Sequence, residues 1–482
     1  MNNSVDQVIE VGVISSNASI LRHVGSVCRE FDYTFDSWSS LEEFMDRGPD
    51  CRVIVTNTSE FKGASQDNAA ECCQAAKAIC NDAFVVCVVQ KTIKKEQLPF
   101  LKKSGADLIL LDHQLTEMSV LEFLLTQQLK ARFIPIKASE LIGESWIDFH
   151  IYHLVPHRAK FLACAIPGAL TSSSLERLKK VSEFYINRRD LGAFRDYLES
   201  REAESSQDLL SRCRIRFLCL CAAYADLVLL LTDQAELASF EKGLELLNQV
   251  RLLCSSLVSV VAEFEDVWEV VDNSSLGNMG SVERSTAVAT YAAVFGLRMD
   301  LDSVEDVMIG ALLTDIGLLG LNSTLLRKMR MQIPLTENEY AQFILHPLAS
   351  VEIALERKLQ MDTRLRRIIA MTHERSDGKG FPERPLPARI PFESQLIQFC
   401  QELDSRTLTK MGELKMDPRV VRAQWVEESI QDTDRFGSYF CSQLEKAWKS
   451  FNEESVAHAQ AKKKALDANL STHPLRKPIS HS

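Results

Sequence analysis

Short runs rich in valine and isoleucine alternate with helical segments between residues 8 and 130, and this alternation limits the possible folds most strongly. The four strand-like runs are Val8–Ile14, Arg52–Thr56, Phe84–Val89 and Asp107–Leu111. The helical segments between them are Ser19–Phe31, Ala69–Cys80 and Lys95–Ser104. Strands and helices alternate in this way when helices cover both faces of a parallel sheet. The pattern therefore predicts an α/β domain over residues 1–131.

The order and size of these segments resemble the receiver domain of response regulators. Such a domain holds magnesium with two acidic residues after its first strand, accepts a phosphoryl group on an aspartate after its third strand, and has a lysine after its fifth. The corresponding places are occupied here by Ser15 and Ser16, by Thr56 and Asn57, and by Asp112. The resemblance thus implies a pseudo-receiver, with the fold and without the phosphoryl chemistry.

A smaller unit follows over residues 132–200. Two alternating runs, Trp146–Leu154 and Lys160–Ile166, are followed by a helix that begins at Ser173. Alternation of polar and apolar residues is typical of half-buried strands, so we predict a small β-rich module.

Residues 201–270 contain two long apolar segments, Leu209–Leu231 and Ala235–Val267, with a helical period in the second. We predict a buried helical hairpin or linker. The longest apolar run, Phe217–Leu231, includes Asp226 and is shorter than the ~20 residues of a membrane span. The sequence thus predicts no membrane span.

The composition excludes several classes of protein. The formal net charge of −11 argues against a nucleic-acid surface, and the 13 cysteines include no CxxC pair. The first residues lack the basic and apolar regions of a signal peptide, which favours a cytoplasmic location. A length of 482 residues predicts two to four domains, and the polar tail 452–482 is expected to be disordered.

The most specific string is THERSDGKGFP at Thr372–Pro382, which resembles the signature HHExxDGxGYP of the HD-GYP family. The matching loop residues are Glu374, Arg375, Asp377, Gly378, Gly380, Phe381 and Pro382, with phenylalanine in the place of the tyrosine. Further resemblances lie at Gly280–Arg284, Ala311–Leu319, His346-Pro347 and Pro387–Asp404. They imply an all-α HD-GYP-like domain over residues 271–451. The unit before it resembles the β-rich module that often precedes such domains.

HD-GYP proteins use these positions to hold two or three metal ions, which activate water against cyclic di-GMP. Metal binding of this kind needs imidazole and carboxylate ligands. Carried over by position, the resemblance implies that four ligands and a nearby lysine are replaced, at Ser281, Thr314, Thr372, Gln401 and Leu318. The residual ligand positions are Asp315, His346 and His373.

Two interpretations of the residual positions stay open. In the first, which we favour, no metal binds, the two histidines form hydrogen bonds inside a helical core, and Asp315 pairs with Arg284 or a helix end. In the second, Asp315, His346 and His373 hold a single Fe or Mn ion, because three ligands with an open position make a chemically reasonable site.

The resemblances together imply a multidomain, non-catalytic signalling or scaffold protein in a bacterial regulatory pathway. Its partners are expected to be proteins, with a diguanylate cyclase (GGDEF-type) domain as the first candidate, and cyclic di-GMP as a further ligand. A homodimer through residues 205–270 is an additional hypothesis. The alternatives are a cyclic di-GMP phosphodiesterase with a one-metal site, and a member of the HDOD family, against which the 377–382 loop argues.

The pseudo-receiver interpretation predicts that the N-terminal domain is not phosphorylated, since Thr56 and Asn57 cannot form an acyl phosphate. Incubation with a small phosphodonor and magnesium should leave the mass of the protein unchanged. A phosphoryl adduct that is lost on mild base treatment would show that an acidic acceptor is present after all.

Overall fold

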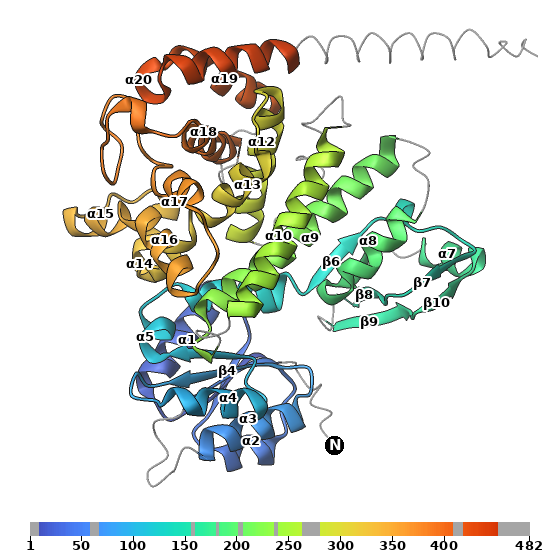
Figure 1. The fold of residues 1–482 in the computed structure, drawn as a ribbon. Helices are drawn as coiled ribbons and strands as arrows, with labels where there is room; N and C mark the ends of the chain where they lie inside the picture. Colours follow the sequence, from blue (N-terminus) through green and yellow to red (C-terminus); the bar gives the residue numbers. More distant parts are fainter. Residues whose placement is uncertain are drawn as a thin grey trace, which may run out of the picture.

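The structure is a computed structural model that describes residues 9–57, 67–155, 160–179, 183–200, 206–235, 240–262, 280–407 and 418–451. In Figure 1 an α/β domain lies at the bottom, a β-rich unit at the right and a helical C-terminal part at the upper left. A helical hairpin runs between the last two. The tail that we predict to be disordered lies outside the described residues.

The N-terminal α/β domain is built on a five-stranded sheet in which every pairing is parallel. Its strands are β1 (Ile9–Ile14), β2 (Phe35–Trp38), β3 (Cys51–Asn57), β4 (Phe84–Val89) and β5 (Leu108–Leu111), in the order β2-β1-β3-β4-β5. This is the strand order of flavodoxin-like doubly wound folds. The helices are α1 (Ala18–Glu30), α2 (Leu41–Arg47), α3 (Asp67–Ile79), η1 (Lys95–Gln97), α4 (Leu98–Lys103), α5 (Asp112–Thr116) and α6 (Val120–Leu125). The predicted parallel sheet is therefore confirmed.

Both faces of this sheet are buried, because alternate residues of one strand enter two different apolar cores. Val11 and Val13 belong to one core, and Ile14 belongs to the other. The sequence did not predict β2, whose four residues include Asp36 and Ser37 and which lies at the edge of the sheet. A short edge strand buries little apolar surface and so has a weak sequence pattern.

The next unit is β-rich. A four-stranded antiparallel sheet joins β6 (Phe133–Ile136), β11 (Phe184–Asn187), β8 (Ile151–Val155) and β9 (Lys160–Ala165). A two-stranded sheet joins β10 (Gly168–Leu170) and β7 (Ser145–Ile147). The helices are η2 (Thr126–Lys130), just before the unit, and η3 (Ala138–Glu140), α7 (Ser172–Leu178), η5 (Arg188–Asp190) and α8 (Leu191–Glu199) within it. The predicted single run Trp146–Leu154 is thus two strands that belong to different sheets.

The helical hairpin consists of α9 (Ser206–Thr232) and α10 (Phe240–Val261). Both helices are long and apolar enough to cross a membrane, by length and composition alone. The shortness of the run Phe217–Leu231 therefore did not by itself exclude a membrane span. In α9, however, 72% of the apolar window is buried inside the protein, against 39% in α10. Within α9, Arg214 forms a buried ion pair of 2.8 Å with Glu140 of the β-rich unit. Burial against the rest of the chain explains the apolar composition of α9.

The regular elements in the described residues of the C-terminal part are helices. Its elements are α12 (Ser281–Arg298), α13 (Val304–Leu313), η7 (Ile316–Gly320), α14 (Ser323–Arg330), α15 (Glu337–Phe343), α16 (His346–Glu356), α17 (Thr363–Ala370), η8 (Pro387–Arg389), α18 (Phe392–Thr407), α19 (Pro418–Gln431) and α20 (Thr433–Phe436). A last helix covers residues 438–451. Helix α13 is buried on nearly all sides, which fits its apolar sequence.

The α/β domain contacts the C-terminal part directly. The Ser119 hydroxyl, just before α6, lies 3.4 Å from the Leu318 carbonyl oxygen and 3.3 Å from that of Leu319 in η7. Glu122 of α6 forms a two-point ion pair with Arg330 at the end of α14. The α/β domain is therefore joined to the short helix η7, which follows the residual ligand Asp315 in the chain.

A second junction surrounds Asp233, which follows α9 and is only 3% exposed. Its carboxylate forms an ion pair with Lys102 of α4 and accepts a hydrogen bond from the Ile109 amide in β5. Its carbonyl oxygen accepts a hydrogen bond of 2.7 Å from Arg357, after α16. One residue thus connects the sheet, the hairpin and the C-terminal helices.

Candidate metal centre

Close contact between two backbone segments places the centre of the site. A Cβ atom on Gly317 in η7 would lie 2.1 Å from the His346 carbonyl oxygen, so only glycine allows this approach. The Ser350 hydroxyl joins the same segments, since it accepts from the Gly317 amide at 2.7 Å and lies 2.6 Å from the Thr314 carbonyl oxygen. The contact brings Asp315, just before η7, beside His346 at the start of α16.

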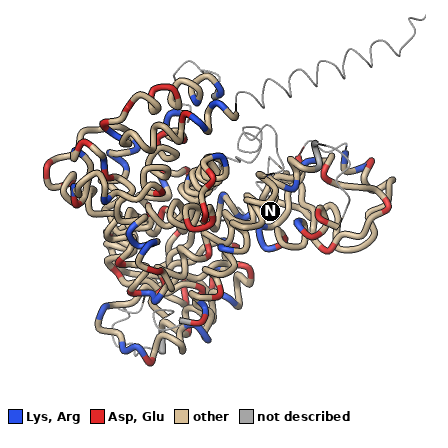
Figure 2. Tube along the Cα trace, turned by 45° about the horizontal axis from the view of Figure 1, so that its top comes forward, with Lys and Arg blue, Asp and Glu red and all other residues tan. Residues whose placement is uncertain are grey.

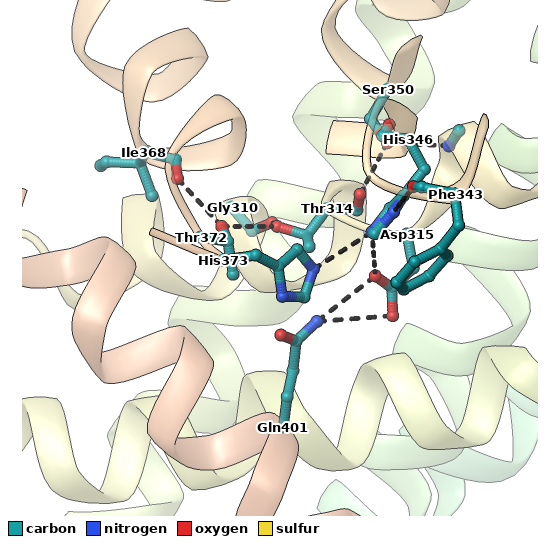
Figure 3. A network of polar contacts seen from close by, with 11 residues as sticks. Gly310, Thr314, Asp315, Phe343, His346, Ser350, Ile368, Thr372, His373 and Gln401 are labelled. Atoms are coloured by element: carbon teal, nitrogen blue, oxygen red, sulfur yellow. Dashed lines mark hydrogen bonds and ion pairs between the residues drawn. The ribbon is translucent and has the colours of Figure 1, made fainter. Parts of the chain in front are cut away.

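The three residual ligand positions come together at this contact (Figure 3). One ligand atom from each of Asp315, His346 and His373 lies within 4.8 Å of the others. The two histidine Nε2 atoms are 3.1 Å apart, and His346 Nε2 is 3.6 Å from a carboxylate oxygen of Asp315. Among the described residues, this is the one group of three histidine, cysteine or acidic side chains arranged to hold a metal ion.

The orientation of His346 is fixed by the backbone. Its Nδ1 lies 2.8 Å from the Phe343 carbonyl oxygen, which can only accept, so Nδ1 carries a proton and donates it. Its other ring nitrogen, Nε2, faces His373 and Asp315. A backbone carbonyl that holds Nδ1–H in this way is a common second contact of metal-binding histidines.

Burial and charge set the protonation of the other two groups. Burial, reinforced by the neighbouring charge of His346, lowers the pKa of His373 to about 3, so its ring is neutral near pH 7. Burial also acts to raise the pKa of Asp315, but the hydrogen bond and charge of His346 outweigh that effect and lower it. Asp315 is therefore ionised, and 31% of its side chain is exposed. The cluster thus offers one carboxylate, the neutral imidazole of His373, and the imidazole of His346, whose Nδ1–H is held by the backbone.

Two threonines occupy the positions that the family resemblance assigns to histidine ligands. Thr314 and Thr372 are fully buried, and their hydroxyl oxygens are 3.1 Å apart. The Thr314 hydroxyl oxygen also lies 2.9 Å from the Gly310 carbonyl oxygen, and that of Thr372 lies 3.0 Å from the Ile368 carbonyl oxygen. Each hydroxyl has one proton, so one threonine can donate to the other while the other donates to its backbone carbonyl, and both buried hydroxyls then have a partner.

Gln401 lies on the other side of Asp315. Its amide nitrogen is 3.3 and 3.4 Å from the two carboxylate oxygens, so it donates to the group that would otherwise face a cation. The expected pairing of Asp315 with Arg284 is wrong, because Arg284 forms its ion pair with Asp404 at 3.2 Å. Arg284 lies on the exposed side of α12, with 47% of its side chain accessible, while Asp404 is a buried acceptor on α18.

The other two positions at which the family resemblance expects a different residue lie at the edge of the site. Ser281 is exposed at the first residue of α12, and Leu318 is half-buried in η7, where its carbonyl oxygen receives Ser119. Neither side chain contributes a polar group to the cluster of Asp315, His346 and His373.

The signature loop is held by its own polar contacts. The Glu374 carboxylate, which is buried, accepts from the amides of Glu383 at 2.6 Å and Arg384 at 2.9 Å. Arg375 forms a two-point ion pair with Asp377, at 3.0 and 2.7 Å. This ion pair is the main reason that the pKa of Asp377 is lowered. The loop keeps a fixed shape with no contribution from a metal.

Aromatic rings cover the two histidines. Phe381 stacks on His373 with 4.8 Å between the ring centroids, and Phe343 stacks on His346 at 4.9 Å. Phe381 is followed by Pro382 in the signature loop. The sequence motif included Phe381. No sequence feature indicated that Phe343, the last residue of α15, would lie at the site.

The donor set fits one metal ion and not two. Two imidazoles and one carboxylate, with one tautomer fixed by the backbone, are suitable ligands for a single transition-metal ion with open positions. By the family resemblance, a second ion would be bound by Asp315 together with the positions of Ser281, Thr314 and Gln401. Thr314 and Gln401 are neutral groups engaged in the hydrogen bonds above. A single ion would be held by Asp315, His346 and His373.

Comparison with known proteins identifies the type of domain that contains the cluster. The family described as HD domain matches residues 273–420, so this region is an HD-type domain. A search of curated proteins finds no match. Among solved structures the chain is similar to Bd1817, an HDG"Y"P protein from Bdellovibrio bacteriovorus, at 17% identity over 66% of this chain and 99% of that chain. The TM-score of that match is 0.42.

The two glycines of the signature loop should respond differently to substitution. A Cβ on Gly380 would lie 2.4 Å from the Arg375 nitrogen and 2.6 Å from the Glu374 Cα, both backbone atoms. Gly380→Ala should therefore lower the free energy of unfolding by about 3 kcal/mol, as for severe overpacking. Gly378 has a φ of +72° and open space around it. Gly378→Asn should cost less than about 1 kcal/mol, because asparagine tolerates this conformation.

Chemical denaturation of both variants checks this difference. Equal effects of the two substitutions would mean that the loop does not have the close backbone contact at Gly380.

Proposed function

We propose that this chain is a non-catalytic signalling or scaffold protein whose HD-type domain resembles the HD-GYP family without its two-metal chemistry. The observation that carries the proposal is the buried hydroxyl pair of Thr314 and Thr372. Hydrolysis of a phosphodiester by such a domain needs ions that both activate water and neutralise the phosphate. The pair places neutral hydroxyls at two positions that the family resemblance assigns to histidine ligands, Thr314 beside one ion and Thr372 beside the other.

The remaining parts of the site support the same proposal. Gln401 donates its amide to Asp315, which partly satisfies the carboxylate without a second cation. Leu318 presents an aliphatic side chain where the family resemblance places a lysine. The described residues of the site are thus connected by hydrogen bonds and stacked rings, and Thr314, Thr372 and Gln401 supply neither imidazole nor carboxylate groups there.

The N-terminal α/β domain fits this proposal as a pseudo-receiver. Its sheet order is that of flavodoxin-like folds, while serine, threonine and asparagine stand at the positions where a receiver needs carboxylates. Two adjacent domains would then each keep a signalling fold and lack its chemistry. We propose that signals pass through protein contacts, in a cytoplasmic protein that also has cyclic di-GMP as a candidate ligand.

A second candidate function rests on the cluster of Asp315, His346 and His373. Their convergence within 4.8 Å favours a single Fe or Mn ion, and with it a phosphodiesterase that works with one metal. When bound, such an ion would lower the pKa of a water molecule and polarise a phosphate oxygen. This chain's residues would hold the ion and leave it accessible on the exposed side of Asp315.

The partner that we propose is a diguanylate cyclase domain bound by the signature loop. The tip of the loop is accessible, with 80% of the Lys379 side chain exposed. Lys379→Glu should weaken capture of an isolated cyclase domain in a pull-down, while Lys358→Glu, which changes a charge outside the loop, should not. Equal capture by both variants would exclude the loop as the contact.

The main prediction is that the protein does not hydrolyse cyclic di-GMP. Loss of one group that stabilises a transition state commonly lowers the rate ~10²–10³-fold, and several such groups are replaced here. Overnight incubation with added iron or manganese under anaerobic, reducing conditions should yield no linear dinucleotide or GMP by chromatography.

The matched variants are His373→Ala, inside the cluster, and His153→Ala, a histidine of the β-rich unit outside it. Product that forms with the wild type and with His153→Ala, and that disappears with His373→Ala, would overturn the non-catalytic proposal. The one-metal enzyme would then be the better account.

A further inference from the structure

Five of the thirteen cysteines lie in one apolar core of the α/β domain. They are Cys51, Cys72, Cys73, Cys80 and Cys87. Charged residues of both signs, by contrast, are interspersed along the described trace (Figure 2). Two pairs of these cysteines are in contact, and each pair connects α3 or its end to a strand of the sheet. Cys80, just after α3, contacts Cys51 at the start of β3, and Cys73 within α3 contacts Cys87 of β4.

The contact between Cys51 and Cys80 is held by the backbone. The Cys80 amide donates to the Ala76 carbonyl oxygen at 2.8 Å, and the Cys80 carbonyl oxygen accepts from the Ala83 amide at 2.9 Å. The Cys80 sulfur accepts from the Cys51 amide at 3.4 Å, and a hydrogen bond also joins the two thiols. The end of a helix and the start of a strand therefore keep the two side chains beside each other.

The two thiols of this pair differ in acidity. The hydrogen bond from the Cys51 thiol, with help from the Cys51 amide, lowers the pKa of Cys80, although burial and the charge of Asp50 oppose this. The same hydrogen bond and burial raise the pKa of Cys51. A larger share of Cys80 is thus thiolate near pH 7 than for an ordinary cysteine, while Cys51 stays protonated. The thiolate is the form that reacts with oxidants.

The Cys51 and Cys80 pair lies near the surface of the domain. The residues that follow Cys80, Asn81 and Asp82, are exposed, and the Cys80 sulfur is 3.0 Å from the carbonyl oxygen of Pro49 in the segment before β3. Cys80 itself is 5% exposed. A molecule as small as hydrogen peroxide needs only such a limited opening, since local motion of loops of this kind is fast.

The second pair has the same arrangement without these properties. Cys73 and Cys87 are fully buried. The hydrogen bond from Cys73, together with burial, raises the pKa of Cys87. A buried thiol with a raised pKa is unreactive, so this pair acts as part of the apolar core and provides a matched control inside the same domain.

We propose that Cys51 and Cys80 form a modification site that peroxide converts to a disulfide. The Cys80 thiolate attacks one oxygen of hydrogen peroxide, the O–O bond breaks, and Cys80 becomes a sulfenic acid. The departing hydroxide takes up the proton that Cys80 had released. The Cys51 thiol then attacks the Cys80 sulfur, the S–O bond breaks, and water leaves with the Cys51 proton. Two thiols are oxidised to one disulfide, and one peroxide is reduced to two water molecules.

The disulfide would tie the end of α3 to the start of β3. The two cysteines are 29 residues apart in the chain, and a crosslink across such a loop restricts the unfolded chain and so stabilises the folded domain. Arg52 and Asp82, next to the pair in sequence, line the small pocket between the α/β domain and the β-rich unit. Oxidation would therefore act at this boundary, independently of any metal at the HD-type domain.

Peptide mapping of the full-length protein after treatment with hydrogen peroxide tests this site. The parent for the test carries Cys164→Ser, because Cys164 is the exposed cysteine and would link separate chains. Mass spectrometry without reductant should find Cys51 and Cys80 in one linked peptide pair, lighter by two hydrogen atoms, about 2 Da, than the two free thiols. A thiol reductant should reverse the link. Cys73 and Cys87 should remain free thiols in the same sample.

Single substitutions separate the two roles. With Cys51→Ser, Cys80 should accumulate as a sulfenic acid that dimedone labels, and with Cys80→Ser, Cys51 should stay a free thiol. Cys87→Ser should leave the link between Cys51 and Cys80 as in the parent. If a variant unfolds, the mapping of the parent decides. Recovery of Cys51 and Cys80 as free thiols from the folded, treated parent, or equal linkage of Cys73 with Cys87, would overturn the proposal.

Discussion

The close backbone contact between η7 and α16 is the constraint on which the site depends. Gly317 approaches the His346 carbonyl oxygen so closely that no side chain fits between them, and the Ser350 hydroxyl closes the gap with hydrogen bonds. This contact fixes Asp315 and His346 relative to each other. The Ser119 hydroxyl of the α/β domain also donates to carbonyl oxygens of η7, so the same short helix connects the N-terminal domain to the site.

Hydrogen bonds connect the described side chains at the positions that the family resemblance assigns to metal ligands. Buried hydroxyl groups are costly unless they are hydrogen-bonded, and Thr314 and Thr372 each have a backbone carbonyl and the other hydroxyl within reach. Aromatic rings cover the histidines, and the signature loop is held by Glu374. These contacts hold the side chains of the site in place, in agreement with the proposed role in binding.

The sequence predicted the parallel sheet and the residues of the site because both leave local patterns. Valine-rich runs identified four of the five strands, and the resemblance to the HD-GYP motifs named three side chains that lie close together, Asp315, His346 and His373. It did not predict the hydroxyl pair or the pairing of Arg284 with Asp404, because these contacts join residues far apart in the chain. Strand β2 was missed because an edge strand needs little apolar sequence.

The number of metal ions bound per chain tests the central claim most directly. Protein purified without a histidine tag, loaded with excess iron or manganese and freed of unbound metal, would be measured by elemental analysis beside His373→Ala. The hydroxyl pair at Thr314 and Thr372 predicts no more than one ion per chain, and none in the variant. Two tightly bound ions per chain would contradict the account, because the second would have to bind at the positions of the neutral side chains Thr314 and Gln401.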